Sequence, residues 1–258
     1  MRKKVMIATV IFSVIVGILS LFDLALYTDL YTDFTKQGPM WIRYALLLLG
    51  IVVCLVPMLY KKQSFSDEIA YAGKGYCFLF LMFISGAYSV YLLLDLFMFK
   101  QDMLAIVKAV LFALFALYCF TMFVHSANKS KKINATIAVI CTLAFYYLAI
   151  ERFLSRTSSL YRFEPALSIV SALVGLVFIT FFLKASYYQA ENRPNAKLIV
   201  FGQMAFFVCT CMEMPHSLYL LLVGAAPITV AMQSVVMGAL GILGLITAYN
   251  TSTNLVKE

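Results

Sequence analysis

The chain has 258 residues, of which 63% are hydrophobic and 12% are charged, and its mean hydropathy is +0.93. Soluble domains contain about 45–50% apolar and about 25% charged residues, so these values exclude an ordinary soluble protein. The net charge of +8 would suggest nucleic-acid binding in a soluble protein. Here the basic residues lie mainly between apolar segments, and we expect no nucleic-acid partner.

Eight apolar segments fill almost the whole sequence. A bilayer core requires about 20 apolar residues per helix, and hydrocarbon offers the backbone no hydrogen-bond partners, so each segment is expected to form a transmembrane helix. We predict an all-α, polytopic integral membrane bundle of eight transmembrane helices, in which residues 1–258 form a single transmembrane domain without a soluble domain. The predicted spans are 5–27, 42–60, 76–98, 104–125, 135–154, 165–188, 198–223 and 228–249.

The distribution of basic residues predicts the orientation. With the N terminus in the cytoplasm, thirteen of the 20 Lys and Arg residues lie on the cytoplasmic side, in agreement with the positive-inside rule. An even number of spans returns the C terminus to the same side. We therefore expect an integral protein of a bacterial plasma membrane with both termini in the cytoplasm. Its expected partners are the lipid bilayer and a membrane or cytoplasmic partner subunit, and the sequence leaves the oligomeric state open.

One carboxylate recurs near the far end of each odd-numbered segment: Asp23, Asp95, Glu151 and Glu213. Each lies 16 to 21 residues after the lysine that precedes its segment. At about 1.5 Å per residue, this places the carboxylates roughly 24–32 Å from the cytoplasmic edge, in the outer third of the membrane. The recurrence at intervals of about one helical hairpin is compatible with four stacked hairpins.

Basic side chains occupy the matching outer ends of other segments. Ionisable groups inside a membrane are costly and usually face the bundle interior in pairs, whereas at the headgroup boundary long side chains reach water. Both interpretations stay open for Asp23 and Asp95. Glu151 and Glu213 lie deeper, and we predict that they face the interior within reach of a basic residue, while the cytoplasmic half of the bundle is nearly pure hydrocarbon. The candidate substrate-binding residues are Glu151, Glu213, His216, Arg152, Asp95, Lys108, Asp23 and Arg43.

The seventh segment contains the densest group of chemically active residues. At about 100° per residue, four of them share one helix face and could converge on an ion as soft and borderline ligands. The same residue types commonly fill cores and interfaces, so they form only a weak candidate set and no metal is predicted. The four residues are Cys209, Met212, Glu213 and His216.

Two prolines, Pro57 and Pro215, fall inside predicted spans and should kink or end the helix locally. Near Pro215 the freed backbone carbonyls would resemble those of the broken helices in transporters. We predict that Glu213 and His216 line an outward-facing pocket at this kink. The alternative is a structural ion pair between Glu213 and Arg152, with His216 in water.

The last segment carries small residues at Ser234, Gly238, Gly241 and Gly244. Such a stripe permits close helix packing, and we favour packing inside the bundle over a dimer face.

Three common catalytic or nucleotide-binding motifs are absent from the sequence. It contains no phosphate-binding Gly-rich loop with its lysine, no Gly-x-Ser-x-Gly elbow and no His-Glu-x-x-His motif, and we expect no cofactor. We favour a small transporter or transporter subunit with a polar site in the outer third of the bilayer. The alternative is a membrane sensor or regulatory protein that couples to a cytoplasmic partner. An intramembrane enzyme acting on a lipid-linked substrate ranks third, so an enzyme is expected less than a non-enzyme.

Overall fold

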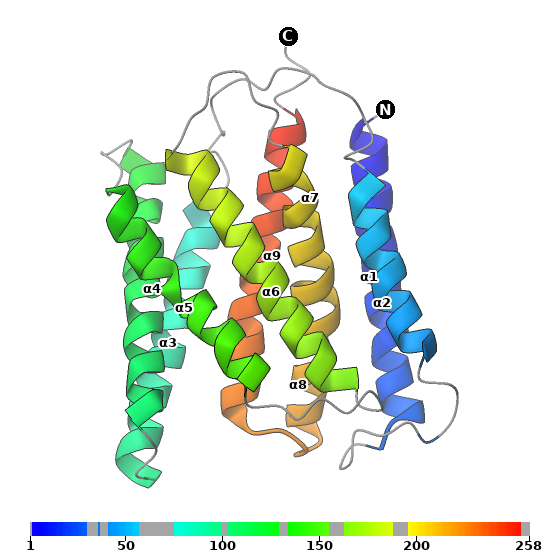
Figure 1. Ribbon diagram of the computed structural model, residues 1–258, viewed down its shortest axis with the longest axis horizontal. Coiled ribbons are helices and arrows are strands. Elements are labelled where there is room, and N and C mark those ends of the chain that lie inside the picture. Colours follow the sequence, from blue (N-terminus) through cyan, green and yellow to red (C-terminus); the bar gives the residue numbers. More distant parts are fainter. Residues whose placement is uncertain are drawn as a thin grey trace.

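The computed structural model describes residues 2–29, 36, 41–56, 75–99, 103–128, 134–154, 163–187 and 196–253, and these form a bundle of helices (Figure 1). Within this part of the chain no strand occurs. The helices are α1 (Arg2–Tyr27), α2 (Trp41–Leu55), α3 (Gly75–Phe99), α4 (Met103–Asn128), α5 (Ala135–Leu154), α6 (Phe163–Tyr187), α7 (Ala196–Ala205), the π-helix η2 (Phe206–Glu213), α8 (Met214–Leu222) and α9 (Ile228–Thr253).

Seven helical stretches are long and apolar enough to cross a membrane, which identifies an integral membrane protein with several spans. They are α1, α3, α4, α5, α6, the continuous helix α7–η2–α8, and α9. The second predicted span is described only over α2, whose 15 residues are fewer than the about 20 that a span requires. The rest of that span, including Pro57, lies outside the described residues. Seven of the eight predicted spans thus correspond to helices that are long and apolar enough to cross a membrane, and the count of eight is not confirmed.

The last two spans form the centre of the bundle. The beginning of α1 and the end of α9 lie at one end of the molecule, here called the terminal side, and the opposite end is called the far side (Figure 1). Helix α9 contacts α3, α6, α7, η2 and α8, and η2 also contacts α1 and α6. Accordingly, the window from α7 to α8 is 78% buried, against 28% for α1. The stacking of four hairpins is not confirmed, because the fourth hairpin lies between the others.

Two apolar clusters pack against the continuous helix α7–η2–α8, here called the central helix. The larger one lies between α3, α4, α5, α6 and α9. Several of its aromatic rings meet edge to face, with the Phe115 and Phe145 ring centroids 4.8 Å apart. The smaller one joins α1 and α2 to η2 through residues such as Val16, Leu47 and Phe207. Large apolar side chains on the outer faces, Phe83 among them, are exposed, as expected for helices that face lipid.

Glycines allow the two central spans to touch backbone to backbone. A Cβ atom on Gly244 would lie 2.7 Å from the carbonyl oxygen of Gly202, and one on Gly241 would lie 2.6 Å from that of Ala205. Ser234 of the same helix is fully buried. The small-residue stripe of the last span therefore packs inside the bundle, as predicted.

The predicted kink at Pro215 takes the form of a π-helix. Proline has no N–H, and its ring collides with the carbonyl one α-helical turn earlier, here that of Cys211. In η2 the turn is wider, so the N–H of Met214 donates to the carbonyl oxygen of Cys209, five residues back. The backbone stays helical through Glu213, and the chain enters α8 without a break. The helix is widened, not ended, just where Glu213 lies.

Candidate functional site

Charged side chains on the far side of the bundle form three ion pairs, each between two helices. The shortest N···O distances are 2.5, 2.7 and 2.7 Å. The prediction that Glu151 and Glu213 lie within reach of a basic residue is therefore confirmed. Asp95 is half-buried in α3, outside these three pairs. The pairs are Asp23–Arg43 between α1 and α2, Lys108–Glu151 between α4 and α5, and Arg152–Glu213 between α5 and η2.

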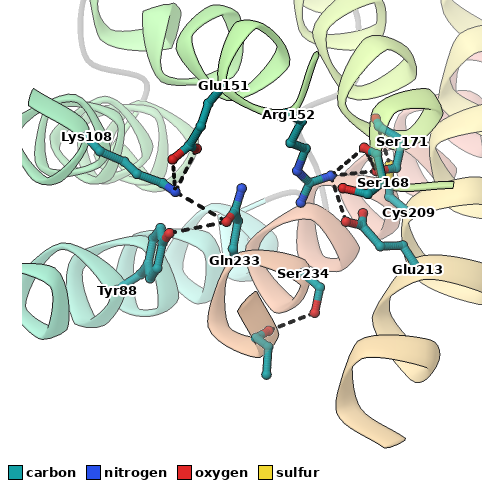
Figure 2. Close-up of polar contacts among 11 residues, drawn as sticks. Tyr88, Lys108, Glu151, Arg152, Ser168, Ser171, Cys209, Glu213, Gln233 and Ser234 are labelled. Carbon is teal, nitrogen blue, oxygen red and sulfur yellow. Dashed lines mark hydrogen bonds and ion pairs between the residues drawn. The ribbon is translucent and has the colours of Figure 1, made fainter. Parts of the chain in front are cut away.

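The Arg152–Glu213 pair is the most deeply buried of the three, with side-chain exposures of 7% and 5%. Arg152 Nη1 lies 2.7 Å from Glu213 Oε1 and also donates to the carbonyl oxygen of Ser168 at 2.7 Å and to Ser171 Oγ at 2.8 Å (Figure 2). Cys209 donates its S–H to the carbonyl oxygen of Ser171 at 3.5 Å. Two charges withdrawn from water require such additional hydrogen bonds to offset their desolvation. The site is built to hold a guanidinium.

The Lys108–Glu151 pair is more open. Lys108 Nζ lies 2.9 and 2.7 Å from the two carboxylate oxygens of Glu151, whose side chain is 33% exposed. Lys108 also donates to Gln233 Oε1 at 3.4 Å, and Tyr88 donates to the same oxygen at 3.5 Å. The lysine in addition lies 5.9 Å above the centre of the Tyr88 ring. This group ties α3, α4, α5 and α9 together around one ammonium.

Helix α5 connects these two pairs. Glu151 and Arg152 are consecutive, so they project about 100° apart around the helix axis. In Figure 2, Glu151 points toward Lys108 and Arg152 points the other way, toward Glu213 and the two serines. A rotation of α5 about its own axis would therefore disturb both pairs at once.

His216 is a further ionisable residue of the central span, close in sequence to Glu213. It is buried in α8, one helical turn after Glu213, and its Nε2 atom has no hydrogen-bond partner among the described residues. Arg43, which is also buried and pairs with Asp23, is near enough to interact electrostatically with His216. The ion pair between Glu213 and Arg152 that the alternative hypothesis predicted is present. Its prediction of His216 in water is wrong, because the side chain is buried. The lining of a pocket by Glu213 and His216 stays a prediction.

The four potential metal ligands of the seventh span do not converge. Cys209 packs in the larger apolar cluster, whereas Met212 packs in the smaller one with Val16 on the other side of the helix. Glu213 is bound to Arg152. Among the described residues, no group of three or more His, Cys, Asp and Glu side chains could hold a metal ion. The helical-wheel argument assumed α-helical turns, and the π-helix changes which residues share a face.

The terminal-side half of the bundle is not pure hydrocarbon, contrary to the sequence-based expectation. Gln203 of α7 is buried there, and its Nε2 donates to Thr9 Oγ1 of α1 at 3.2 Å. The Oε1 atom of Gln203 has no hydrogen-bond partner within the part of the chain that the structure describes. Single uncharged residues in apolar segments gave too weak a signal to identify this contact.

Sequence reasoning also missed the ligands that surround Arg152. Ser168 and Ser171 are three residues apart and therefore lie on one face of α6, but serines are common in apolar helices and did not stand out. The π-helix had a usable signal in Pro215, whose ring excludes a normal α-helical hydrogen bond to Cys211.

Comparison with protein-family models, with curated proteins and with solved structures finds no match for this chain.

Proposed function

We propose that this protein is a small transporter, or a subunit of one, for a charged solute, and that its substrate site is the group of ion pairs on the far side. The observation that carries the proposal is the Arg152–Glu213 pair, which is buried against a π-helix in the most central span. π-Helical turns frequently occur at functional sites, and buried charges within a membrane commonly belong to a substrate or ion pathway.

The chemistry of the pair suits reversible exchange of partners. A guanidinium does not lose its proton in a protein, so Arg152 always requires a negative partner when water is excluded. That partner is Glu213 when the site is empty, and an anionic group of a solute could replace it. A cationic group of a solute could equally replace Arg152 as the partner of Glu213. Charged solutes are therefore the class that this site can recognise.

Further polar groups follow the interface between α1 and the central helix toward the terminal side. On the terminal side of His216, Gly17 of α1 lies directly against the carbonyl oxygen of Cys211. A Cβ atom at position 17 would prevent this contact. Further along the same interface, Gln203 meets Thr9. Broken or widened helices in transporters present backbone carbonyls to the substrate in a similar manner. These residues support a path along α1 in preference to one through the aromatic core.

The orientation predicted from the loops would place this site on the outer side of the membrane. With both termini in the cytoplasm, the ion pairs lie in the outer third of the bilayer and Gln203 in the inner half. The backbone contact between Gly202 and Gly244 would then hold the central spans together on the cytoplasmic side. Transport by alternating access requires this contact to separate in a second conformation.

The test uses the full chain in proteoliposomes on a solid support, where concentration jumps of a transported charged solute produce a current. Four solute classes are applied: carboxylates, zwitterionic amino acids, organic amines and inorganic ions. We expect a current with at least one class in the wild type and in Lys4→Gln, which removes an exposed charge on the terminal side, and none in the double variant R152M/E213Q. Equal responses in wild type and double variant, or no response to any class, would refute the proposal.

One observation favours a sensor as the second candidate. The glycine contacts between α7 and α9 couple two central helices that extend from the ion-pair region to the terminal side. A change in the ion pairs could shift these helices as a unit and be detected by a cytoplasmic partner without any solute crossing. In that case a ligand would stabilise the protein in detergent, with the stabilisation lost in R152M/E213Q, but proteoliposomes would carry no current.

A further inference from the structure

A groove on the membrane-facing side of α5 and α6, on the terminal side of the bundle, is independent of the ion pairs. It has a volume of about 400 Å³, within the usual range of ligand sites, about 300–1,000 Å³. Val139, Thr142 and Tyr146 line it from α5, and Thr180, Leu183 and Lys184 line it from α6. These residues recur at helical spacing, so each helix contributes one continuous face.

The walls of the groove are mostly apolar, although Tyr146 and Tyr187 also line it. The Thr142 hydroxyl donates to the carbonyl oxygen of Val139 at 2.9 Å, and the Thr180 hydroxyl donates to that of Leu176 at 2.8 Å. Both hydroxyls are thus satisfied within their own helices. Walls of this kind favour an apolar occupant, and in a membrane the available apolar occupant is an acyl chain.

The length of the groove matches one leaflet. Its α5 face extends from Ala135, at the start of the helix, to Tyr146. Eleven residues at about 1.5 Å each give roughly 16 Å. Half of the hydrocarbon core of a bilayer measures about 15 Å. A single acyl chain of the leaflet on the terminal side would therefore fill the groove from the headgroup level to the middle of the membrane.

Lys184 supplies a charge at the headgroup end. It is exposed in the last turn of α6, three residues before the helix ends at Tyr187. A lysine there can extend its ammonium to the membrane surface. No carboxylate of the described residues forms an ion pair with it. An ammonium above an acyl-chain groove is complementary to the phosphate of an acidic lipid whose headgroup carries a net negative charge.

We infer that the α5–α6 groove is a binding site for one acidic phospholipid of the leaflet on the terminal side, with an acyl chain along Val139 and Leu183 and the phosphate at Lys184. An acidic phospholipid matches both the apolar walls of the groove and the positive charge at its end. The site does not depend on the proposed transport function, since none of the three ion pairs contributes to it.

The experiment is native mass spectrometry of the full chain, incubated with equimolar phosphatidylglycerol and phosphatidylcholine. Attraction of a surface lysine to acidic lipid predicts about a fivefold excess of bound phosphatidylglycerol in the wild type. Lys184→Gln should reduce this excess to parity, while Lys4→Gln, which removes an exposed lysine from α1 at the same end, should retain it. An unchanged preference in Lys184→Gln would overturn the assignment of the headgroup.

A matched pair of tryptophan variants tests the acyl-chain part. Val139 and Ile140 are adjacent and each is 47% exposed, but only Val139 lines the groove. Val139→Trp should abolish retention of the single lipid, and Ile140→Trp should retain it, with equal thermal midpoints in both. Equal lipid binding by the two variants would overturn the proposal. Displacement of the bound lipid by inorganic phosphate alone would do so too, because it would show that the acyl chain is not held.

Discussion

Removing the negative partner of Arg152 is the most informative single change. Glu213→Gln keeps the size of the side chain and leaves a guanidinium buried without its counter-charge. Breaking a buried pair in this way costs about 3–5 kcal/mol. Arg152 keeps its hydrogen bonds to Ser168 and Ser171, so we expect the lower end of that range. At about 2–4 °C per kcal/mol for a chain of this size, a loss of about 3 kcal/mol lowers the thermal midpoint by roughly 6–12 °C.

The double variant R152M/E213Q removes both charges and serves as the control. Replacing both partners of a buried pair is often neutral in stability. Ser171 also donates to the carbonyl oxygen of Ser168 at 2.9 Å, so the two serines satisfy each other when the guanidinium is gone. Most of the lost stability should therefore return in the double variant, as measured by thermal unfolding in detergent. A midpoint of E213Q within 2 °C of the wild type, or a double variant no more stable than E213Q, would refute the reasoning.

Three further predictions concern other parts of the bundle. Lys108→Met should cost only about 1 kcal/mol in unfolding free energy, because the partner Glu151 is partly exposed and can be hydrated, and a midpoint as low as that of E213Q would contradict this. Gly244→Ala should lower stability by about 1–3 kcal/mol, because its Cβ would meet the backbone of Gly202, while Gly86→Ala, whose Cβ would meet only the side chain of Ala116 at 3.9 Å, should be neutral or stabilising. Single cysteines at 28–41 should react with an impermeant maleimide from outside the cell and those at 61–75 should not, and the reverse pattern would invert the predicted topology.

The class of the protein and the depth of its charges follow from the sequence alone. Long apolar segments have one stable form in hydrocarbon, because only a helix satisfies its own backbone there. The fixed rise of a helix then converts residue number into depth, which is why Glu151, Glu213 and Lys108 were expected at one level. Their two ion pairs involve the consecutive residues Glu151 and Arg152, in agreement with this expectation.

The choice of partners required the tertiary structure. At one depth any of the three cations could have met any of the carboxylates, and the actual pairing depends on which helices are neighbours. Which helices are neighbours depends on close backbone contacts such as that between Gly202 and Gly244. The positions of small residues in the sequence do not show which of them meet. The π-helix before Pro215 likewise changed the faces on which Cys209 and Met212 lie. Depth is a property of one helix, but a site belongs to several, and only their packing determines which side chains meet.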